Sequence, residues 1–473
     1  MKRIIISILL ISVLLLSACD AARSVVGTYI NKDGELIVEY SDGSDENLGI
    51  VVGSDGVDGE NGQNGKDGID GKDGIDGKDG KDGLDGKDGQ NGKDGKDGET
   101  VIGSPSGDQY DIQITPSGSG TTVSAASKAM LSAVTVSCGF KAVGSTAEDG
   151  RSGGSGVIYS LDKSAGYALI ITNYHVVYNS NKKYTTGISN DIKVYLYGSE
   201  YAEWAIPATY VGGSLTYDIA VLLVEDSDIL RQSSATVVSI SDSDSVSLGD
   251  EAIAIGNAEG MGLSVTRGII SVISEQIDML GADDATNVSF RMMRIDTPVN
   301  HGNSGGGLFN DRGELIGIVS AKHIEEGVEG IGYAIPSNLA VAVAQNIIDN
   351  CLNKSSTKVI KALLGIVVTI NSSKSVYDTE TGKISVVESI VVDSVTETSS
   401  LFGSLEAKDM IVGISVGNRS ITLKRQYQLL EILLYARLGD TVTLNVIRTL
   451  DSGEVEEHSF SVIITANHLS TVE

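Results

Sequence analysis

From Gly53 to Gly98 every third residue is glycine, which places 16 glycines in 46 residues without a break. The positions between the glycines are mostly Lys-Asp and Ile-Asp pairs, and the segment contains no proline. A strict Gly-X-Y period is what a collagen triple helix requires, because only glycine fits where three chains meet at the axis. The period therefore predicts a collagen-like stalk over residues 53–98 that brings three chains together.

The charge of this repeat decides how such a stalk is held together. It carries 7 Lys against 12 Asp and 1 Glu, so its net charge is 7 − 13 = −6. Without proline to stiffen the chain, a triple helix here depends on Lys–Asp pairing between chains. Two alternatives remain open. A disordered acidic linker has no reason to keep the period, and a calcium-binding β-roll carries paired glycines, which this run lacks.

The first residues resemble a bacterial lipoprotein signal peptide. Lys2 and Arg3 precede an apolar run from Ile4 to Leu16, and Leu16-Ser17-Ala18-Cys19 follows directly. The resemblance implies cleavage after residue 18, lipidation of Cys19 and attachment to the extracytoplasmic face of a bacterial cell membrane. The alternative is an uncleaved anchor, although the run is short for a membrane-spanning helix. Of the other cysteines, Cys138 and Cys351 lie near apolar residues, so we expect two buried free thiols.

Composition excludes several classes of protein. The chain has 473 residues with a hydrophobic fraction of 41%, too high for a wholly disordered protein. Its formal net charge of −28 disfavours nucleic-acid binding, because phosphate repels an acidic surface. No His-Glu-x-x-His motif is present, and the five histidines are scattered. We therefore expect neither a metal nor another cofactor.

Turn residues and composition divide the chain further. In residues 19–52 we expect a hairpin with strands 25–30 and 35–40 around an Asn-Lys-Asp-Gly turn. Residues 99–124 are rich in Ser, Thr, Gly and Pro and read as a flexible linker. From 125 to about 335 short β-branched segments alternate with turns, which is typical of an all-β sandwich or barrel. Residues 338–352 have helical spacing of apolar positions and close this domain, predicted to span 125–352.

Three polar motifs interrupt the β-rich block. His175 ends an apolar strand, Asp218 begins another, and Ser304 lies in the Gly302-Asn303-Ser304-Gly305-Gly306 loop. A serine hydroxyl becomes a nucleophile when a base takes its proton, and a carboxylate orients that base. Glycines around the serine let backbone N–H groups point at a developing oxyanion. Each motif alone is weaker evidence than the three together, which predict a His-Asp-Ser catalytic triad.

These residues resemble chymotrypsin-fold serine proteases of the HtrA (Deg) family. The resemblance implies two six-stranded β-barrels with Ser304 as nucleophile, His175 as general base and Asp218 as the orienting carboxylate. It places the oxyanion hole at the N–H groups of Gly302 and Ser304, with Asn303 beside them. It also places a specificity pocket for small aliphatic side chains near residues 318–321. The stretches that carry it are Thr172–Val177, Asp218–Leu222, Gly256-Asn257, Ser264–Ser271, Gly302–Gly306 and Gly332–Pro336.

Two positions depart from the family pattern. Gly307 stands where the family has Pro or Ala, and we expect it to loosen the loop around the serine. His301 stands where the family often has Pro. A rival-base role for His301 is disfavoured because it lies only three residues from Ser304 on the same loop. A hydrogen bond within the loop and a pH-sensitive contact remain open for it.

A second β-rich unit over residues 358–466 resembles one PDZ domain. The resemblance places Leu364-Gly365-Ile366 at the loop that captures the carboxylate of a peptide C-terminus. The alternative is an ordinary β-turn. The expected fold class is thus all-β: a chymotrypsin-like double β-barrel followed by a PDZ domain and preceded by a collagen-like repeat.

The sequence leaves two candidate functions. The first is a membrane-tethered extracytoplasmic serine endopeptidase for quality control of unfolded or damaged proteins, working as a homotrimer without cofactor. The second is a non-enzymatic trimeric adhesin or holdase that uses the stalk and the PDZ domain. The complete set of His175, Asp218 and Ser304 favours the enzyme.

Overall fold

The computed structural model describes residues 25–32, 35–41, 43–50, 121–145, 148–199, 202–320, 330–354 and 356–472. The predicted signal peptide, Cys19, the Gly-X-Y repeat and most of the linker lie outside these ranges. The chain forms two compact units, residues 1–107 and 108–473, and each is described by itself. Within the described ranges no helix has the length and apolar character that crossing a membrane requires.

The N-terminal unit contains a three-stranded antiparallel sheet in the order β1-β2-β3. Both expected strands are present, as β1 (Val25–Ile30) and β2 (Glu35–Tyr40), and a third, β3 (Asp45–Ile50), joins them. The Glu35 carboxylate accepts from the Asn31 amide at 2.8 Å and from the Asn47 amide at 2.9 Å, and these bonds lower its pKa. Sequence alone did not predict β3, because Asp45-Glu46-Asn47 lacks apolar alternation and its pairing depends on such cross-strand bonds.

The first β-barrel closes in the order β10-β11-β6-β5-β4-β9, and every neighbouring pair is antiparallel. Its core consists of aliphatic side chains such as Ile158, Ile170 and Leu222, which are fully buried. Short helices and strands lie in the loops between its strands. The strands are β4 (Ala133–Lys141), β5 (Glu148–Asp162), β6 (Tyr167–Thr172), β9 (Asp191–Leu196), β10 (Ile206–Ser214) and β11 (Ile219–Val224); the short elements are α3 (Tyr174–Val177), β7 (Tyr178–Asn179), β8 (Gly187–Ile188), η2 (Ala202–Trp204) and α4 (Asp228–Gln232).

The second β-barrel closes in the order β12-β13-β14-β17-β16-β15, so the expected pair of six-stranded barrels is confirmed. Its strands are β12 (Glu251–Gly256), β13 (Ser264–Leu280), β14 (Asn287–Ile295), β15 (Gly307–Phe309), β16 (Leu315–Ser320) and β17 (Gly332–Pro336), with η3 (Ser243–Ser245) and η4 (Ala258–Gly260) in its loops. Strands β11 and β16 are buried along their whole length, because one face closes a barrel and the other packs against a helix.

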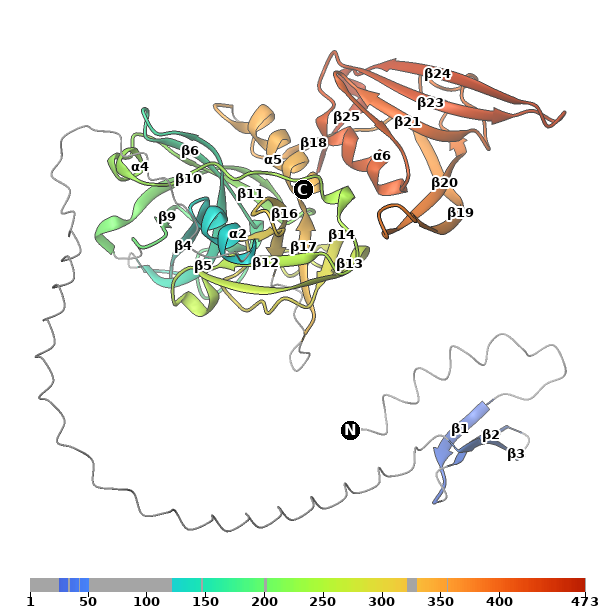
Figure 1. The fold of residues 1–473 in the computed structure, drawn as a ribbon, viewed down its shortest axis with the longest axis horizontal. Coiled ribbons are helices and arrows are strands. Elements are labelled where there is room, and N and C mark those ends of the chain that lie inside the picture. The colour runs from blue at the N-terminus through green and yellow to red at the C-terminus, as the bar shows by residue number, and fades with distance from the viewer. Residues whose placement is uncertain are drawn as a thin grey trace, which may run out of the picture. The chain divides into compact units, whose positions relative to one another are not determined.

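That helix is α5 (Ser337–Cys351), which matches the helix expected over 338–352. It packs on β10 and β11 of the first barrel and on β16 of the second (Figure 1). A second helix, α2 (Thr121–Met130), corrects the predicted end of the linker. Glycine and proline are absent from residues 121–130, and the buried Ala125 and Ala129 give this segment an apolar face. The linker interpretation therefore ends before Thr121 rather than at residue 124.

The last part of the second unit, residues 359–472, is called the C-terminal unit below. It is built on a sheet with the order β19-β20-β21-β23-β24 and a smaller pair of β18 with β25. Its core is aliphatic and includes Leu364, Ile414, Leu429 and Leu444. Strand β25 lies beyond residue 466, where the unit was expected to end. It belongs to the unit because it pairs with β18, the first strand of the unit. The elements are β18 (Val359–Ala362), β19 (Ile366–Tyr377), β20 (Ile384–Val395), β21 (Met410–Val416), β22 (Arg419–Thr422), α6 (Gln426–Ile432), η6 (Leu433–Tyr435), β23 (Thr441–Thr449), β24 (Val455–Ile463), η7 (Ala466–His468) and β25 (Leu469–Val472).

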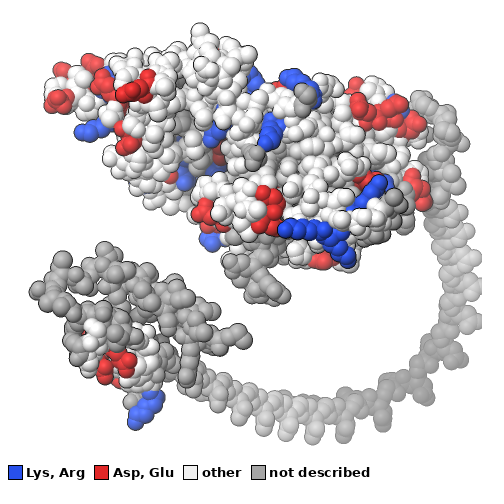
Figure 2. All heavy atoms as spheres, turned by 180° about the vertical axis from the view of Figure 1, so that it is seen from behind, with Lys and Arg blue, Asp and Glu red and all other residues white. Residues whose placement is uncertain are grey.

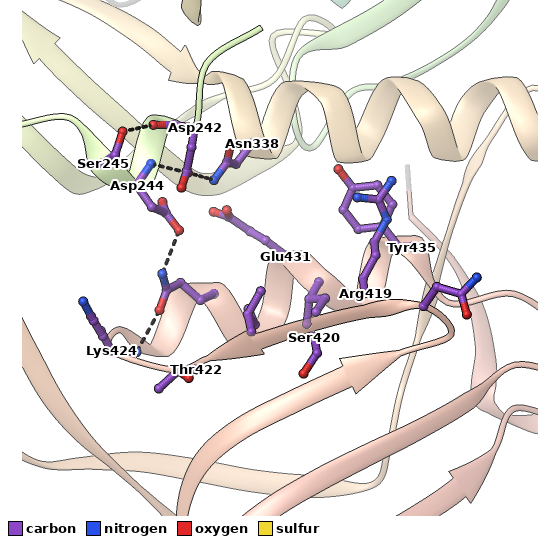
Figure 3. A pocket seen from close by; sticks show the side chains of 14 residues that line it. Asp242, Asp244, Ser245, Asn338, Arg419, Ser420, Thr422, Lys424, Glu431 and Tyr435 are labelled. Carbon is purple, nitrogen blue, oxygen red and sulfur yellow. Dashed lines mark hydrogen bonds between the residues drawn. The ribbon is translucent and has the colours of Figure 1, made fainter.

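A buried ion pair joins this unit to the second barrel. Arg291 of β14 donates to both carboxylate oxygens of Glu431 on α6, at 2.7 and 2.8 Å. The Arg291 side chain is 3% exposed, and its guanidinium lies over the Tyr427 ring. Beside this seam lies a cavity of about 780 Å³ that contains none of the predicted catalytic residues. Figure 3 shows Asp242 and Asp244 on one side of it, Glu431 on another, and Arg419 stacked on Tyr435.

The charged surface is mixed in sign. On the face drawn in Figure 2, acidic side chains form small groups separated by wide uncharged areas, and basic side chains lie between them. This face has no single continuous basic surface of the kind that phosphate backbones need.

Asn346 on α5 fixes the helix to the C-terminal unit. Its side chain is fully buried, donates to the carbonyls of Ile360 and Leu434 at 2.6 Å each, and accepts from the Ile360 N–H at 2.9 Å. We expect Asn346→Ala to lower the free energy of unfolding by about 2–4 kcal/mol, because it leaves buried backbone groups unsatisfied. Guanidinium unfolding measures the loss. Asn350→Ala removes only the two bonds that its amide donates to the carbonyl and side-chain oxygens of Asn346, so it should cost less; equal midpoints for both variants would contradict the role of Asn346 in joining α5 to the C-terminal unit.

Candidate active site

His175 and Asp218 meet at the end of the first barrel. Strand β6 ends at Thr172 and the chain turns into the short helix α3, which carries His175. His175 Nδ1 lies 2.7 Å from Asp218 Oδ2, and the His175 backbone N–H donates to Asp218 Oδ1 at 3.0 Å. With its proton on Nδ1, the ring donates to the carboxylate and leaves Nε2 as a proton acceptor. The two residues predicted as base and orienting carboxylate are thus in direct contact.

The backbone of Asp218 is held in an unusual conformation. Its φ is +50°, in the left-handed region that non-glycine residues rarely adopt. Its carbonyl accepts from the Asn173 amide at 2.8 Å and from the Tyr174 N–H at 3.2 Å, so backbone and side chain hold the same loop. The Ser320 hydroxyl also donates to Asp218 Oδ2, at 3.3 Å. Ser320, expected near a specificity pocket, thus supports the carboxylate; its predicted neighbour Ala321 lies outside the described residues.

The Ser304 loop is shaped by two glycines with positive φ, +93° at Gly302 and +84° at Gly305. A Cβ on Gly302 would lie 2.1 Å from the Asn257 carbonyl oxygen, and one on Gly305 would lie 2.2 Å from the Ser155 carbonyl oxygen. Side chains are therefore excluded at both positions by backbone atoms as well as by φ. The sequence prediction that this loop needs glycine is explained by these contacts.

Ser304 lies next to the segment that carries His175, although the two residues belong to different barrels. A Cβ on Gly154 would lie 2.6 Å from a methyl group of Val176, which follows His175, and 3.0 Å from the Ser304 carbonyl oxygen. The Ser155 N–H donates to that same carbonyl at 2.8 Å. Strand β5 therefore connects the Ser304 loop of the second barrel to the segment of the first barrel that carries His175.

The hydroxyl of Ser155 was not predicted as a functional group. It donates to the Gly302 carbonyl at 2.7 Å and accepts from the Asn257 N–H at 2.8 Å, and the residue is fully buried. Because the Gly302 carbonyl is held on this side, the peptide that precedes Asn303 has a fixed orientation. The only signal in the sequence was a serine within a buried, glycine-rich strand, which is too common to single out.

Of the residues predicted at the oxyanion hole, Asn303 has no N–H available for an oxyanion. The Asn303 N–H donates to the Asn300 carbonyl at 3.1 Å, so Asn303 closes the turn and has no N–H left for a substrate. The Gly302 N–H meets no acceptor in the described part of the chain. His301 is exposed, and its carbonyl accepts from the Glu259 N–H at 2.7 Å.

Gly307 does not loosen the loop as expected. It begins strand β15, where it pairs with Ile255 on one side and Ile318 on the other. A Cβ at this position would lie 2.4 Å from the buried ring of Phe309. The aromatic ring of Phe309 therefore occupies the space that a side chain at position 307 would need.

The two remaining cysteines do not compete as nucleophiles. Cys138 and Cys351 are free and buried, as expected. Burial raises the pKa of the Cys138 thiol to about 12 and also raises that of Cys351. Leu364-Gly365-Ile366 lies in the C-terminal unit and is not part of the site around Ser304.

Comparison with known proteins agrees with this geometry. A family model described as a trypsin-like peptidase domain matches residues 154–318, and one described as a collagen triple helix repeat matches residues 51–108. The serine protease Do-like HtrA of Lactococcus lactis subsp. cremoris is 33% identical over 341 residues, which cover 67% of this chain and 76% of that protein. The chain belongs to the HtrA family of serine proteases.

Other HtrA relatives match over shorter parts. The serine protease Do-like HtrA of Bacillus subtilis is 32% identical over 315 residues, and the match spans 62% of that protein's length. The periplasmic pH-dependent serine endoprotease DegQ of Escherichia coli is 36% identical over 198 residues, 41% of this chain and 37% of that protein.

We expect Ser155→Ala to lower kcat about tenfold while leaving KM nearly unchanged, because the hydroxyl orients the loop rather than touching substrate. Hydrolysis of a chromogenic peptide gives both constants, and the melting temperature monitors stability. Ser160→Ala on the same strand is the matched control. A change in KM alone, or equal effects of the two variants, would show that Ser155 has no special role in orienting the loop.

Proposed function

We propose that this HtrA-family chain is a membrane-tethered serine endopeptidase that degrades unfolded or damaged proteins outside the cytoplasm. The contact of His175 with Asp218 beside the Ser304 loop is the observation that carries the proposal. The names of the relatives, serine protease and periplasmic endoprotease, support the same reaction and compartment.

In the proposed mechanism Ser304 Oγ attacks the scissile carbonyl while His175 Nε2 takes its proton. The buried Asp218 carboxylate stabilises the imidazolium and holds the ring through Nδ1. His175 then returns the proton to the leaving amine, and water repeats the sequence on the acyl-enzyme. Asp218 is suited to this role because three donors already surround its carboxylate.

The developing oxyanion is stabilised by backbone N–H groups of Gly302 and Ser304. The carbonyls of the two peptides that carry these N–H groups are held on the opposite side: the His301 carbonyl accepts from the Glu259 N–H at 2.7 Å, and the Asn303 carbonyl accepts from the Gly306 N–H at 3.0 Å. Ser155 holds the peptide between them through the Gly302 carbonyl. Because the donors are oriented before substrate arrives, little reorganisation is needed as charge develops. Asn303 contributes by closing the turn, not by donating.

We assign peptide binding to Leu364-Gly365-Ile366 in a PDZ-like unit. The Leu364 carbonyl accepts from the Ser399 hydroxyl at 2.6 Å, and the Gly365 carbonyl accepts from the Thr396 N–H at 2.8 Å. In a trans peptide the N–H points opposite to the C=O, so the N–H groups of Gly365 and Ile366 face away from these partners. They are directed to the position where a peptide carboxylate would bind, at the start of the edge strand β19.

A lipid on Cys19 and a stalk over residues 53–98 complete the proposal. The match to the collagen triple helix repeat supports a trimeric stalk, because a triple helix needs three chains.

We expect Ser304→Ala to abolish cleavage of casein, with a loss of at least about a thousandfold, since the nucleophile is removed. Labelling by a fluorophosphonate probe checks the same residue directly, and Ser320→Ala, which keeps the nucleophile, should still be labelled. A wild-type protein that neither cleaves casein nor reacts with the probe would favour the non-enzymatic adhesin or holdase instead.

We expect residues 20–473 in solution to have three times the monomer mass by light scattering, because the repeat brings three chains together. Circular dichroism on heating should show a cooperative melt of the triple helix below the unfolding of the barrels. A monomeric mass would contradict the trimer, and a trimer without such a melt would contradict the stalk alone.

A further inference from the structure

Strand β19 has an outer edge that no strand covers in the described part of the chain. It stands at the end of the sheet order β19-β20-β21-β23-β24 and is twelve residues long. An edge strand presents unpaired backbone N–H and C=O groups that an extended chain can join. On β19 this edge begins at Ile366, directly beside the proposed carboxylate loop.

Helix α6 accompanies only the first part of this edge. Its first residue, Gln426, donates from the side-chain amide to the Val368 carbonyl at 3.3 Å. This bond shows that the Val368 carbonyl points away from β20 and towards α6, so the peptide groove that we propose lies between β19 and α6. Nine further residues, 369–377, continue the strand past this point, a length of about 30 Å.

The distal part of β19 forms a two-stranded ribbon with β20. Strand β20 pairs in register with β21 at Val391 and Met410, and in the described part of the chain no strand pairs with residues 384–389 on their other side, where the Lys424 carbonyl accepts from the Glu388 N–H at 2.8 Å. The register places Tyr377 opposite Ile384 and Ser375 opposite Val386, so the three apolar side chains share one face. Their exposed fractions are 64% for Tyr377, 41% for Ile384 and 37% for Val386.

The ribbon is nearly uncharged although the whole chain has a net charge of −28. Residues 369–377 include one charged side chain, Lys374, and residues 384–389 include one, Glu388. Edge strands of soluble proteins are normally protected by charge, proline, a β-bulge or a covering element. Strand β19 has a bulge between Ile370 and Ser372, and beyond it residues 372–377 pair regularly with 384–389. A long, open, weakly charged edge with exposed apolar side chains indicates a surface that binds an extended chain.

We propose that the distal edge of β19, residues 370–377, binds the segment upstream of a substrate's C-terminus as an added strand. The proposal rests on peptide capture at Leu364-Gly365-Ile366. With its carboxylate in that loop, a peptide runs antiparallel to β19. After about five residues it passes the N-terminal end of α6, at Gln426. The next seven or eight residues then pair with residues 370–377. The preferred occupant is an unfolded, neutral segment with β-branched or aromatic residues at alternate positions.

Continuity with the groove favours this occupant over a second copy of the chain. Two β19 edges that paired with each other along their length would also cover Ile366 and Val368. Such a pair would exclude the peptide from the groove, whereas one extended chain uses the groove and the ribbon together.

The test measures binding of labelled peptides to residues 20–473 carrying Ser304→Ala, so that no peptide is cleaved. Peptides of 5, 9 and 13 residues share the same C-terminal five, and their upstream residues alternate Val and Ser. We expect the 13-residue peptide to bind at least about tenfold more tightly than the 5-residue peptide. Hydrogen exchange should show protection of the 370–377 amides by the long peptide only.

Tyr377→Asp should remove this gain with length and leave the affinity of the 5-residue peptide unchanged. Val455→Asp is the matched control, because Val455 is 61% exposed on β24 at the opposite edge of the sheet. A 13-residue peptide with N-methyl groups at alternate residues beyond the fifth should bind no better than the short one, since it lacks N–H donors for the strand.

The outcomes separate this inference from the function on which it rests. Binding of the 5-residue peptide without any gain for longer ones overturns the ribbon proposal and retains the carboxylate loop. Failure of every peptide overturns the loop itself. A change in assembly mass caused by Tyr377→Asp, with no effect of peptide length, would show that the ribbon joins copies of the chain instead.

Discussion

The contact between Ser155 and the Ser304 loop is the interaction on which the site depends. It crosses from the first barrel to the second: the Ser155 N–H holds the Ser304 carbonyl, and its hydroxyl holds the Gly302 carbonyl and the Asn257 N–H. Each bond connects backbone groups that would be costly to bury unpaired. Because β5 also lies against the helix that carries His175, one strand places all three predicted catalytic residues in a common region.

Buried polar side chains also join the C-terminal unit to the rest of the described chain. Asn346 joins α5 to β18 and η6, and Arg291 joins β14 to α6 through Glu431. Apolar packing supplies most of the stability in each unit, but it is not directional. The hydrogen bonds at these seams are directional, and they fix how the C-terminal unit meets the barrels.

The candidate catalytic residues could be predicted from the sequence, whereas the residues that hold them in place by hydrogen bonds could not. His175, Asp218, Ser304 and the glycines around the serine stand in short motifs whose spacing reflects local backbone geometry. Ser155 has no such motif, since its partners are 147 and 102 residues away in the sequence. Strand β3 and the start of α2 were missed for a related reason: their formation depends on tertiary partners that outweigh weak local preference.

The sequence by itself determined the Gly-X-Y period, the β-rich block, the helix that closes it and the identity of the candidate catalytic residues. These features depend on steric rules, side-chain alternation and functional-group chemistry that act over a few residues. Tertiary structure alone decided that Asn303 closes a turn, that Gly307 leaves space for Phe309, and that in the described part of the chain no strand pairs with the outer edge of β19. Those outcomes depend on which distant atoms occupy the neighbouring space, and no local pattern encodes that.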